Sequence, residues 1–284
     1  MTGIAVGPPR QILVATDLSE RAGMAVTRAA QLSHEHGAHL TALHVLPVEI
    51  NGENDDRARS SLEAHLTEYL DCAPVDIAIR RGTAASEISA EAANLAADLV
   101  VAGAHGAHWL AHAFLGSTAE NLVRMSPVAV LLVKKLTKVA YRTVDLAVDT
   151  SAPSADAARF ASGLTPVADH IVVHACIVVG ENLMRMHGVG AEEIEGLRRT
   201  CTEEAREHIA RLTDTLPRPP RRVIITSGHP ATRLAELCQS HAADPVVVGT
   251  GTRSPVSYAL LGSVAQQVMR QSQSDVLVVP AVYT

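Results

Sequence analysis

The chain has 284 residues, enough for about two ordinary domains that each bury a core of their own. Apolar residues make up 47% of it, only 2% are aromatic, and the net charge at neutral pH is −6. This composition argues against a nucleic-acid partner, which needs a basic stripe and, for single strands, aromatic side chains that stack on bases.

In the first half, short runs rich in Val, Ile and Leu alternate with longer stretches of helical pattern, which is typical of parallel βαβ units. The first helix has Ser19 as its N-cap and Gly37 at its C-cap, Thr83 or Ser86 caps the third helix, and Ser117 opens the fourth. The strands between them should be buried on both faces, because their apolar runs are continuous. We expect these strands at residues 11–16, 39–46, 75–80, 98–103 and 128–134.

The second half repeats the first. A shift of 146 residues superposes residues 82–133 on 228–279 without a gap, and 18 of the 52 positions are identical. Farther upstream, residues 12–19 match 144–151 at a smaller shift, so the second half carries an insertion, which we place around 180–195. A repeat of this length is a duplicated domain and not a solenoid.

The duplication predicts two tandem domains, residues 1–138 and 139–284. Each should be a doubly wound, parallel, five-stranded α/β sheet with helices on both faces. The fifth strand of each sheet would lie at an apolar edge, so the two halves should pack together as a pseudo-dimer, and two chains could join as a homodimer. The strands of the second half are expected at residues 143–148, 169–178, 221–227, 245–250 and 275–280.

A glycine-rich segment follows the fourth strand. Its spacing G-x2-G-x9-G-S is formed by Gly103, Gly106, Gly116 and Ser117, and a helix opens at the last pair. Glycines let backbone N–H groups approach an anion closely, and a helix N-terminus presents unpaired N–H groups to it. The segment is therefore a candidate phosphate cradle, although it is neither a P-loop nor a G-x-G-x-x-G dinucleotide motif.

The carboxyl ends of the strands bring further residues to this segment. Asp17 ends the first strand, Val45 lies in the last part of the second, and Gly103 ends the fourth. In an open α/β sheet, ligands bind at this edge. An adenine nucleotide suits such a crevice, with its base at the strand ends, its ribose near a carboxylate and its phosphates over the glycine segment.

Several stretches together resemble the universal stress protein family in its tandem form. They are A-T-D-L-S after the first strand, L-H-V-L-P at the second, A-A-D-L-V-V-A-G-A-H-G at the fourth, then x9-G-S and S-P-V-A-V-L-L-V. The resemblance covers both halves. It implies a Rossmann-like fold of the adenine nucleotide alpha hydrolase-like type and ATP binding with or without Mg²⁺. It also implies a cytoplasmic role in stress adaptation, with an unknown protein partner and without metabolic catalysis.

Carried over by position, the resemblance implies ten ATP contacts. Many relatives have Arg after the second loop glycine, where this chain has Ala107, which leaves one phosphate contact in doubt. The implied contacts are Ala15, Thr16, Asp17, Val45, Ala102, Gly103, Gly106, Gly116, Ser117 and Thr118.

The second half departs from this pattern. Thr252 stands at the position of Gly106, Gly251 comes one residue early, and Arg253 follows. A β-branched residue does not readily adopt positive φ, and its side chain would occupy the space of a phosphate. We therefore expect one ATP per chain, held by the first half, with Arg253 as a partial compensation in the second.

Other interpretations of these residues stay open. Asp17 could merely cap the first helix or lie solvated at the end of the strand, although Ser19 already offers a capping hydroxyl. His105, His108 and His112 form a weak metal pattern without a carboxylate nearby. A slow ATP hydrolase that positions water with Asp17 or His105 is an alternative function, as is an interaction protein that binds no nucleotide. We expect no catalytic residues and no metal site.

The remaining signals concern location. The four cysteines form no C-x-x-C pair, which fits a reducing cytoplasm. The longest apolar stretch, residues 171–179, is interrupted by His174 and is too short to span a membrane.

The only lysines, Lys134, Lys135 and Lys138, fall between the halves and predict a solvated connector.

Overall fold

The structure is a computed structural model that describes residues 7–48, 55–70, 74–105, 115–241, 244–251 and 261–281. The first half contains β1 (Gln11–Thr16), α1 (Glu20–His36), β2 (His39–Leu46), α2 (Asp55–Tyr69), β3 (Asp76–Arg81), α3 (Ala84–Asn94), β4 (Leu99–Gly103), α4 (Ser117–Met125) and β5 (Ala129–Val133). The second half contains β6 (Thr143–Ala147), α5 (Ala152–Leu164), β7 (Asp169–Cys176), α6 (Glu181–Met186), α7 (Ala191–Thr213), β8 (Arg222–Ser227), α8 (Pro230–His241), β9 (Val246–Gly249), α9 (Ser263–Gln271) and β10 (Val276–Val279). The strands lie within two residues of the predicted positions.

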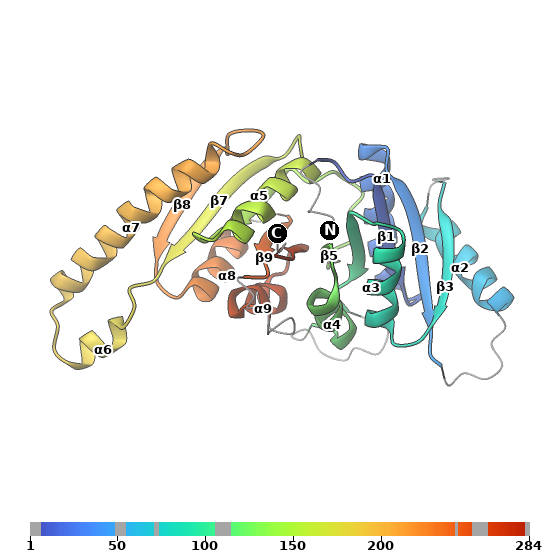
Figure 1. Ribbon diagram of the computed structural model, residues 1–284, viewed down its shortest axis with the longest axis horizontal. Helices are drawn as coiled ribbons and strands as arrows, with labels where there is room; N and C mark the ends of the chain where they lie inside the picture. Colours follow the sequence, from blue (N-terminus) through green and yellow to red (C-terminus); the bar gives the residue numbers. More distant parts are fainter. Residues whose placement is uncertain are drawn as a thin grey trace.

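The two halves share one sheet of ten strands, in the order β3-β2-β1-β4-β5-β10-β9-β6-β7-β8 (Figure 1). All pairs within a half are parallel, and the halves meet where β5 pairs antiparallel with β10. The predicted α/β fold and its pseudo-dimer packing are thereby confirmed. Because the two fifth strands cover each other, they leave no apolar edge for a second chain, and the homodimer stays a prediction.

The two faces of the sheet carry separate cores. In β1, Ile12 and Val14 face α1 and α2, while Leu13 and Ala15 face α3 and α4. The second half does the same, with α5 and α7 on one face and α8 and α9 on the other. This alternation explains why the strands read as continuous apolar runs, since both faces are buried.

The helix ends follow the predicted caps. The Ser19 side chain accepts a hydrogen bond from the Ala22 N–H, and Gly37 ends α1 at φ 62° in the left-handed region that favours glycine. Thr83 occupies the N-cap position of α3 without a side-chain hydrogen bond. The extra chain of the second half lies between β7 and β8, where α6 and the 23-residue α7 extend outward from the sheet (Figure 1).

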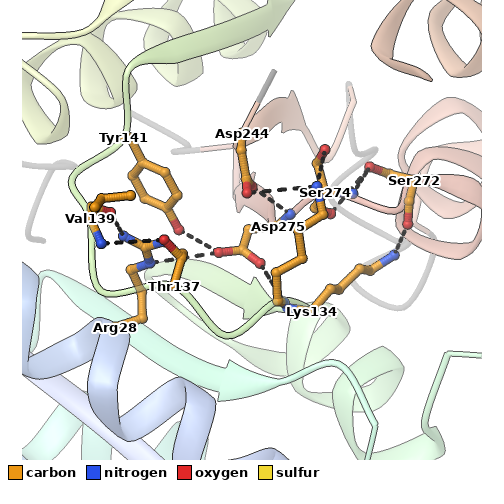
Figure 2. A network of polar contacts seen from close by, with 10 residues as sticks. Arg28, Lys134, Thr137, Val139, Tyr141, Asp244, Ser272, Ser274 and Asp275 are labelled. Carbon is orange, nitrogen blue, oxygen red and sulfur yellow. Dashed lines mark hydrogen bonds and ion pairs between the residues drawn. The ribbon is translucent and has the colours of Figure 1, made fainter. Parts of the chain in front are cut away.

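The prediction of a solvated lysine connector is wrong for Lys134. Its Nζ donates to the backbone carbonyls of Met269 and Ser272, each at 2.6 Å, so it ties the end of β5 to the end of α9. Figure 2 shows the contact with Ser272. Its backbone N–H also donates to Asp275. Burial lowers the pKa of the Lys134 ammonium to about 8, and the Asp275 carboxylate opposes that shift.

Asp275 is the centre of this network between the halves. It is fully buried and accepts a hydrogen bond from the Tyr141 hydroxyl at 2.7 Å. The guanidinium of Arg28, which is 1% exposed, lies 3.7 Å from Asp275 and stacks over the Tyr141 ring (Figure 2). Burial and the Asp275 carboxylate raise the pKa of Tyr141 well above its usual value of 10, against the opposing effect of Arg28. Charged groups that lie far apart in the sequence therefore join the halves in the interior.

Candidate functional site

A cavity of about 380 Å³ opens at the carboxyl ends of β1, β2 and β4. Nine of the ten predicted contact residues line it, and the tenth, Gly106, lies outside the described residues. The structure thus brings together positions from four separate segments, while their role as nucleotide contacts stays a prediction. The nine are Ala15, Thr16, Asp17, Val45, Ala102, Gly103, Gly116, Ser117 and Thr118.

One wall of the cavity is apolar and the other is polar. The apolar wall includes Leu43 and Val45 of β2, Ile88 of α3 and Leu122 of α4. On the polar side, α4 begins at Ser117, and the first N–H groups of a helix have no acceptor within it. An apolar wall beside such a helix N-terminus suits a ligand with a flat base at one end and phosphates at the other.

Gly103 and Gly116 border the cavity, at the end of β4 and at the start of α4. A Cβ on Gly103 would lie 3.4 Å from the His105 carbonyl oxygen and 3.7 Å from that of Arg21, so the loop packs directly on the start of α1. Gly116 is the N-cap of α4 at φ −63° and ψ 141°, a conformation open to any residue, and its N–H donates to the Ala104 carbonyl. Its small size leaves room in the cavity, and its N–H is already engaged.

Asp17 supports the helix cap and also lines the cavity. Its Oδ1 accepts from the backbone N–H of Ser19 at 3.1 Å and from the Ser19 hydroxyl at 2.5 Å. The N-cap of α1 is Ser19 and not Asp17, so the alternative that Asp17 caps this helix is wrong; Asp17 instead holds the Ser19 hydroxyl. A carboxylate held at this edge can accept hydrogen bonds from the hydroxyls of a ribose.

Sequence reasoning missed His65 of α2. Its Nε2 lies 3.0 Å from Oγ1 of Thr16, and the same Oγ1 accepts from the Leu18 N–H at 3.0 Å. The Thr16 hydroxyl therefore joins His65 of α2 to the turn after β1, at the mouth of the cavity. Burial lowers the pKa of His65, against the opposing effects of Glu68 and Asp17. No local pattern marks this contact, since 49 residues separate the partners.

This contact predicts a pH dependence of stability. The unfolded chain takes up the His65 proton near pH 6.5, whereas the folded chain takes it up only at lower pH, so the free energy of unfolding falls as the pH drops below about 6.5. One such group contributes at most about 1.4 kcal/mol per pH unit. Urea unfolding at pH 7.5 and 5.5 should show a smaller fall for His65→Gln than for the wild type. An equal fall in the two proteins would contradict the role of His65.

The second half has a matching cavity, also of about 380 Å³. Its carboxylate is Asp149, which accepts from the Ser151 N–H and hydroxyl as Asp17 does from Ser19. Two hydroxyl residues of the first cavity are apolar here, because Val148 and Val264 replace Thr16 and Thr118. Size therefore does not distinguish the halves, and the predicted asymmetry depends on chemistry. Thr252 and Arg253, on which that prediction rests, lie outside the described residues.

A metal centre is not visible in the part of the chain that the structure describes. No group of three His, Cys, Asp or Glu residues is placed there to hold a metal ion. His108 and His112 lie outside the described residues, so the weak histidine pattern of the loop is not tested. Among the described helices, none combines the length and the apolar character needed to cross a bilayer.

The fold and its cavities define a tandem, doubly wound α/β protein with one cavity at the carboxyl-end edge of each half. The profile of the universal stress protein family matches the chain twice, at residues 9–134 and 140–280. The chain therefore belongs to the universal stress protein family. The resemblance found in the sequence motifs is confirmed.

One curated sequence and two solved structures match nearly the whole chain. A universal stress protein of Mycolicibacterium smegmatis is 27% identical over 291 residues, which cover 94% of this chain and 96% of that protein. A crystal structure of a protein of unknown function from Pseudomonas aeruginosa PAO1 has a TM-score of 0.73 at 22% identity and covers 98% of this chain and 95% of its own. A universal stress protein from Archaeoglobus fulgidus has a TM-score of 0.64 at 20% identity, with coverages of 95% and 98%.

Proposed function

We propose that the chain binds one ATP in the cavity of its first half and acts as a nucleotide-sensing regulatory module in stress adaptation, in the cytoplasm. One observation carries this proposal. Nine positions chosen from the sequence line a single cavity that combines an apolar wall, a carboxylate and a helix N-terminus.

Each part of the ligand has a matching part of the wall. The adenine packs between Leu43, Val45 and Ile88, and the ribose hydroxyls meet Asp17. The phosphates lie over Ser117 and Thr118, where the N-terminus of α4 favours negative charge by roughly 0.3–1 kcal/mol per charge. These hydroxyls, amides and one carboxylate provide binding groups, and we propose a binding role and not a metabolic one.

The two aspartates provide a matched test. Asp17→Asn should weaken ATP binding about tenfold or more, because a hydrogen bond to a charged group contributes roughly 1.5–3 kcal/mol. Asp149→Asn makes the same change in the same local geometry of the second half and should leave the affinity unchanged. Isothermal titration of ATP into both variants measures the difference. An equal loss in both would mean that the halves bind alike, and no binding to the wild type would refute the proposal.

A further inference from the structure

A second cavity adjoins the nucleotide cavity at the junction of the two halves. It has a volume of about 420 Å³ and shares Gly103 and His105 with the nucleotide cavity. Its wall comes from both halves, with Arg21 of α1 and Lys134 after β5 on one side and residues 270–273 at the end of α9 on the other. We call it the junction cavity.

The junction cavity is lined by cations. Arg21, Lys134 and Arg270 contribute to its wall, and none of the described residues that line it is Asp or Glu. This is a local concentration of positive charge in a chain whose net charge is −6. Arg270 pairs with Glu120 of α4 at 3.1 Å, but Glu120 also pairs with Arg124, so one carboxylate serves two guanidinium groups. Cations gathered in a concave surface focus a potential that attracts anions.

Lys134 is held in position for such an anion. Its two hydrogen bonds to the carbonyls of Met269 and Ser272 fix the ammonium at the wall, and Figure 2 shows the one to Ser272. An ammonium has three N–H groups, so one is left for a ligand in the cavity. Because burial lowers the pKa of Lys134 to about 8, its charge is poorly solvated, and an anion beside it would offset that cost.

The other half lacks these cations. The shifts that superpose the halves place Pro153 at the position of Arg21 and Pro280 at that of Lys134. Only Arg270 has a basic counterpart, which is Arg124. The fold therefore does not require these cations, and they lie only beside the cavity of the first half.

We propose that the junction cavity is an anion site that takes a phosphate group next to the nucleotide cavity of the first half. Where that phosphate belongs to the nucleotide itself, the inference rests on the proposed function. The same chemistry has two sources, namely the end of the phosphate chain of the bound nucleotide and a separate phosphate or pyrophosphate ion. In both cases the second half takes part in ligand binding through Arg270.

The test titrates the full chain with ATP, AMP and inorganic pyrophosphate at low ionic strength. Arg21→Gln and Arg270→Gln each remove one cation. Both residues are exposed, so neither change disturbs the core. Arg206→Gln is the control, because it makes the same change of charge at an exposed residue of α7, outside the junction cavity and away from Glu120.

If the nucleotide supplies the phosphate, the two cavity variants should weaken ATP binding about tenfold or more and leave AMP binding within about twofold. If a separate ion supplies it, they should weaken pyrophosphate binding by a similar factor and leave ATP binding unchanged. Unchanged affinities for both ATP and pyrophosphate, an equal loss for AMP, or an equal loss in Arg206→Gln would overturn the inference. Pyrophosphate binding that depends on Arg270, in a chain that binds no adenine nucleotide, would support the inference and refute the proposed function.

Discussion

Replacing Gly116 by valine is expected to lower the affinity for ATP at least about a hundredfold. The backbone of Gly116, at φ −63° and ψ 141°, is one that valine adopts readily, so the chain should still fold. The new side chain would stand at the N-terminus of α4, against the phosphates, and would separate them from several N–H groups at once. Losing several such interactions costs a few kcal/mol, which accounts for the expected factor.

Gly262→Val is the matched control in the second half. Gly262 is the N-cap of α9 and has nearly the same backbone conformation as Gly116. A Cβ there would lie 3.2 Å from the Thr250 carbonyl oxygen, so its thermal unfolding must first be compared with that of the wild type. Titration of the folded variant should give nearly the wild-type affinity. A stronger loss from Gly262→Val than from Gly116→Val would show that the second half holds the nucleotide.

Replacing Asp275 by alanine is expected to lower the free energy of unfolding by about 3–5 kcal/mol. Asp275 is fully buried, and its removal leaves the guanidinium of Arg28 in the interior without its carboxylate. The Tyr141 hydroxyl and the Lys134 N–H also lose their acceptor. Asp76→Ala, at the exposed start of β3, is the control and should change stability by less than about 0.5 kcal/mol in urea unfolding.

The other half suggests how to rescue this variant. In the second half, Phe160 stands at the position of Arg28. In the first half, Ala129 stands at the position of Asp275. Both residues are buried. The double variant Arg28→Phe/Asp275→Ala copies this apolar pair and should recover at least half of the lost stability, since it leaves no buried charge unpaired. A double variant less stable than Asp275→Ala alone would contradict the account, as would a loss below about 1 kcal/mol in Asp275→Ala.

The sequence predicts what local pattern determines. Strand positions, the caps at Ser19 and Gly37 and the edge that gathers Asp17, Val45 and Gly103 all follow from apolar runs and the geometry of parallel sheets. The full set of nine candidate residues that line one cavity comes from the family resemblance, which adds residues such as Ala15, Thr16 and Ala102 to those that this rule gathers.

What the sequence does not predict depends on contacts between distant segments. Lys134 looks like a connector residue because its two carbonyl partners are about 135 residues away. The ion pair of Arg28 and Asp275 crosses the halves, and His65 reaches Thr16 from a neighbouring helix. None of these contacts has a period or a motif, and none was expected from the sequence. The chemistry of Gly106 and Thr252 stays a prediction, because both residues lie outside the described part of the chain.

The most direct test of nucleotide binding by the first half is a native mass spectrum of the chain in the presence of excess ATP, recorded for the wild type and for Gly116→Val. We predict that the wild type carries one ATP per chain and that Gly116→Val carries none. A wild-type chain without nucleotide at millimolar ATP, or with two ATP molecules bound, would contradict this account.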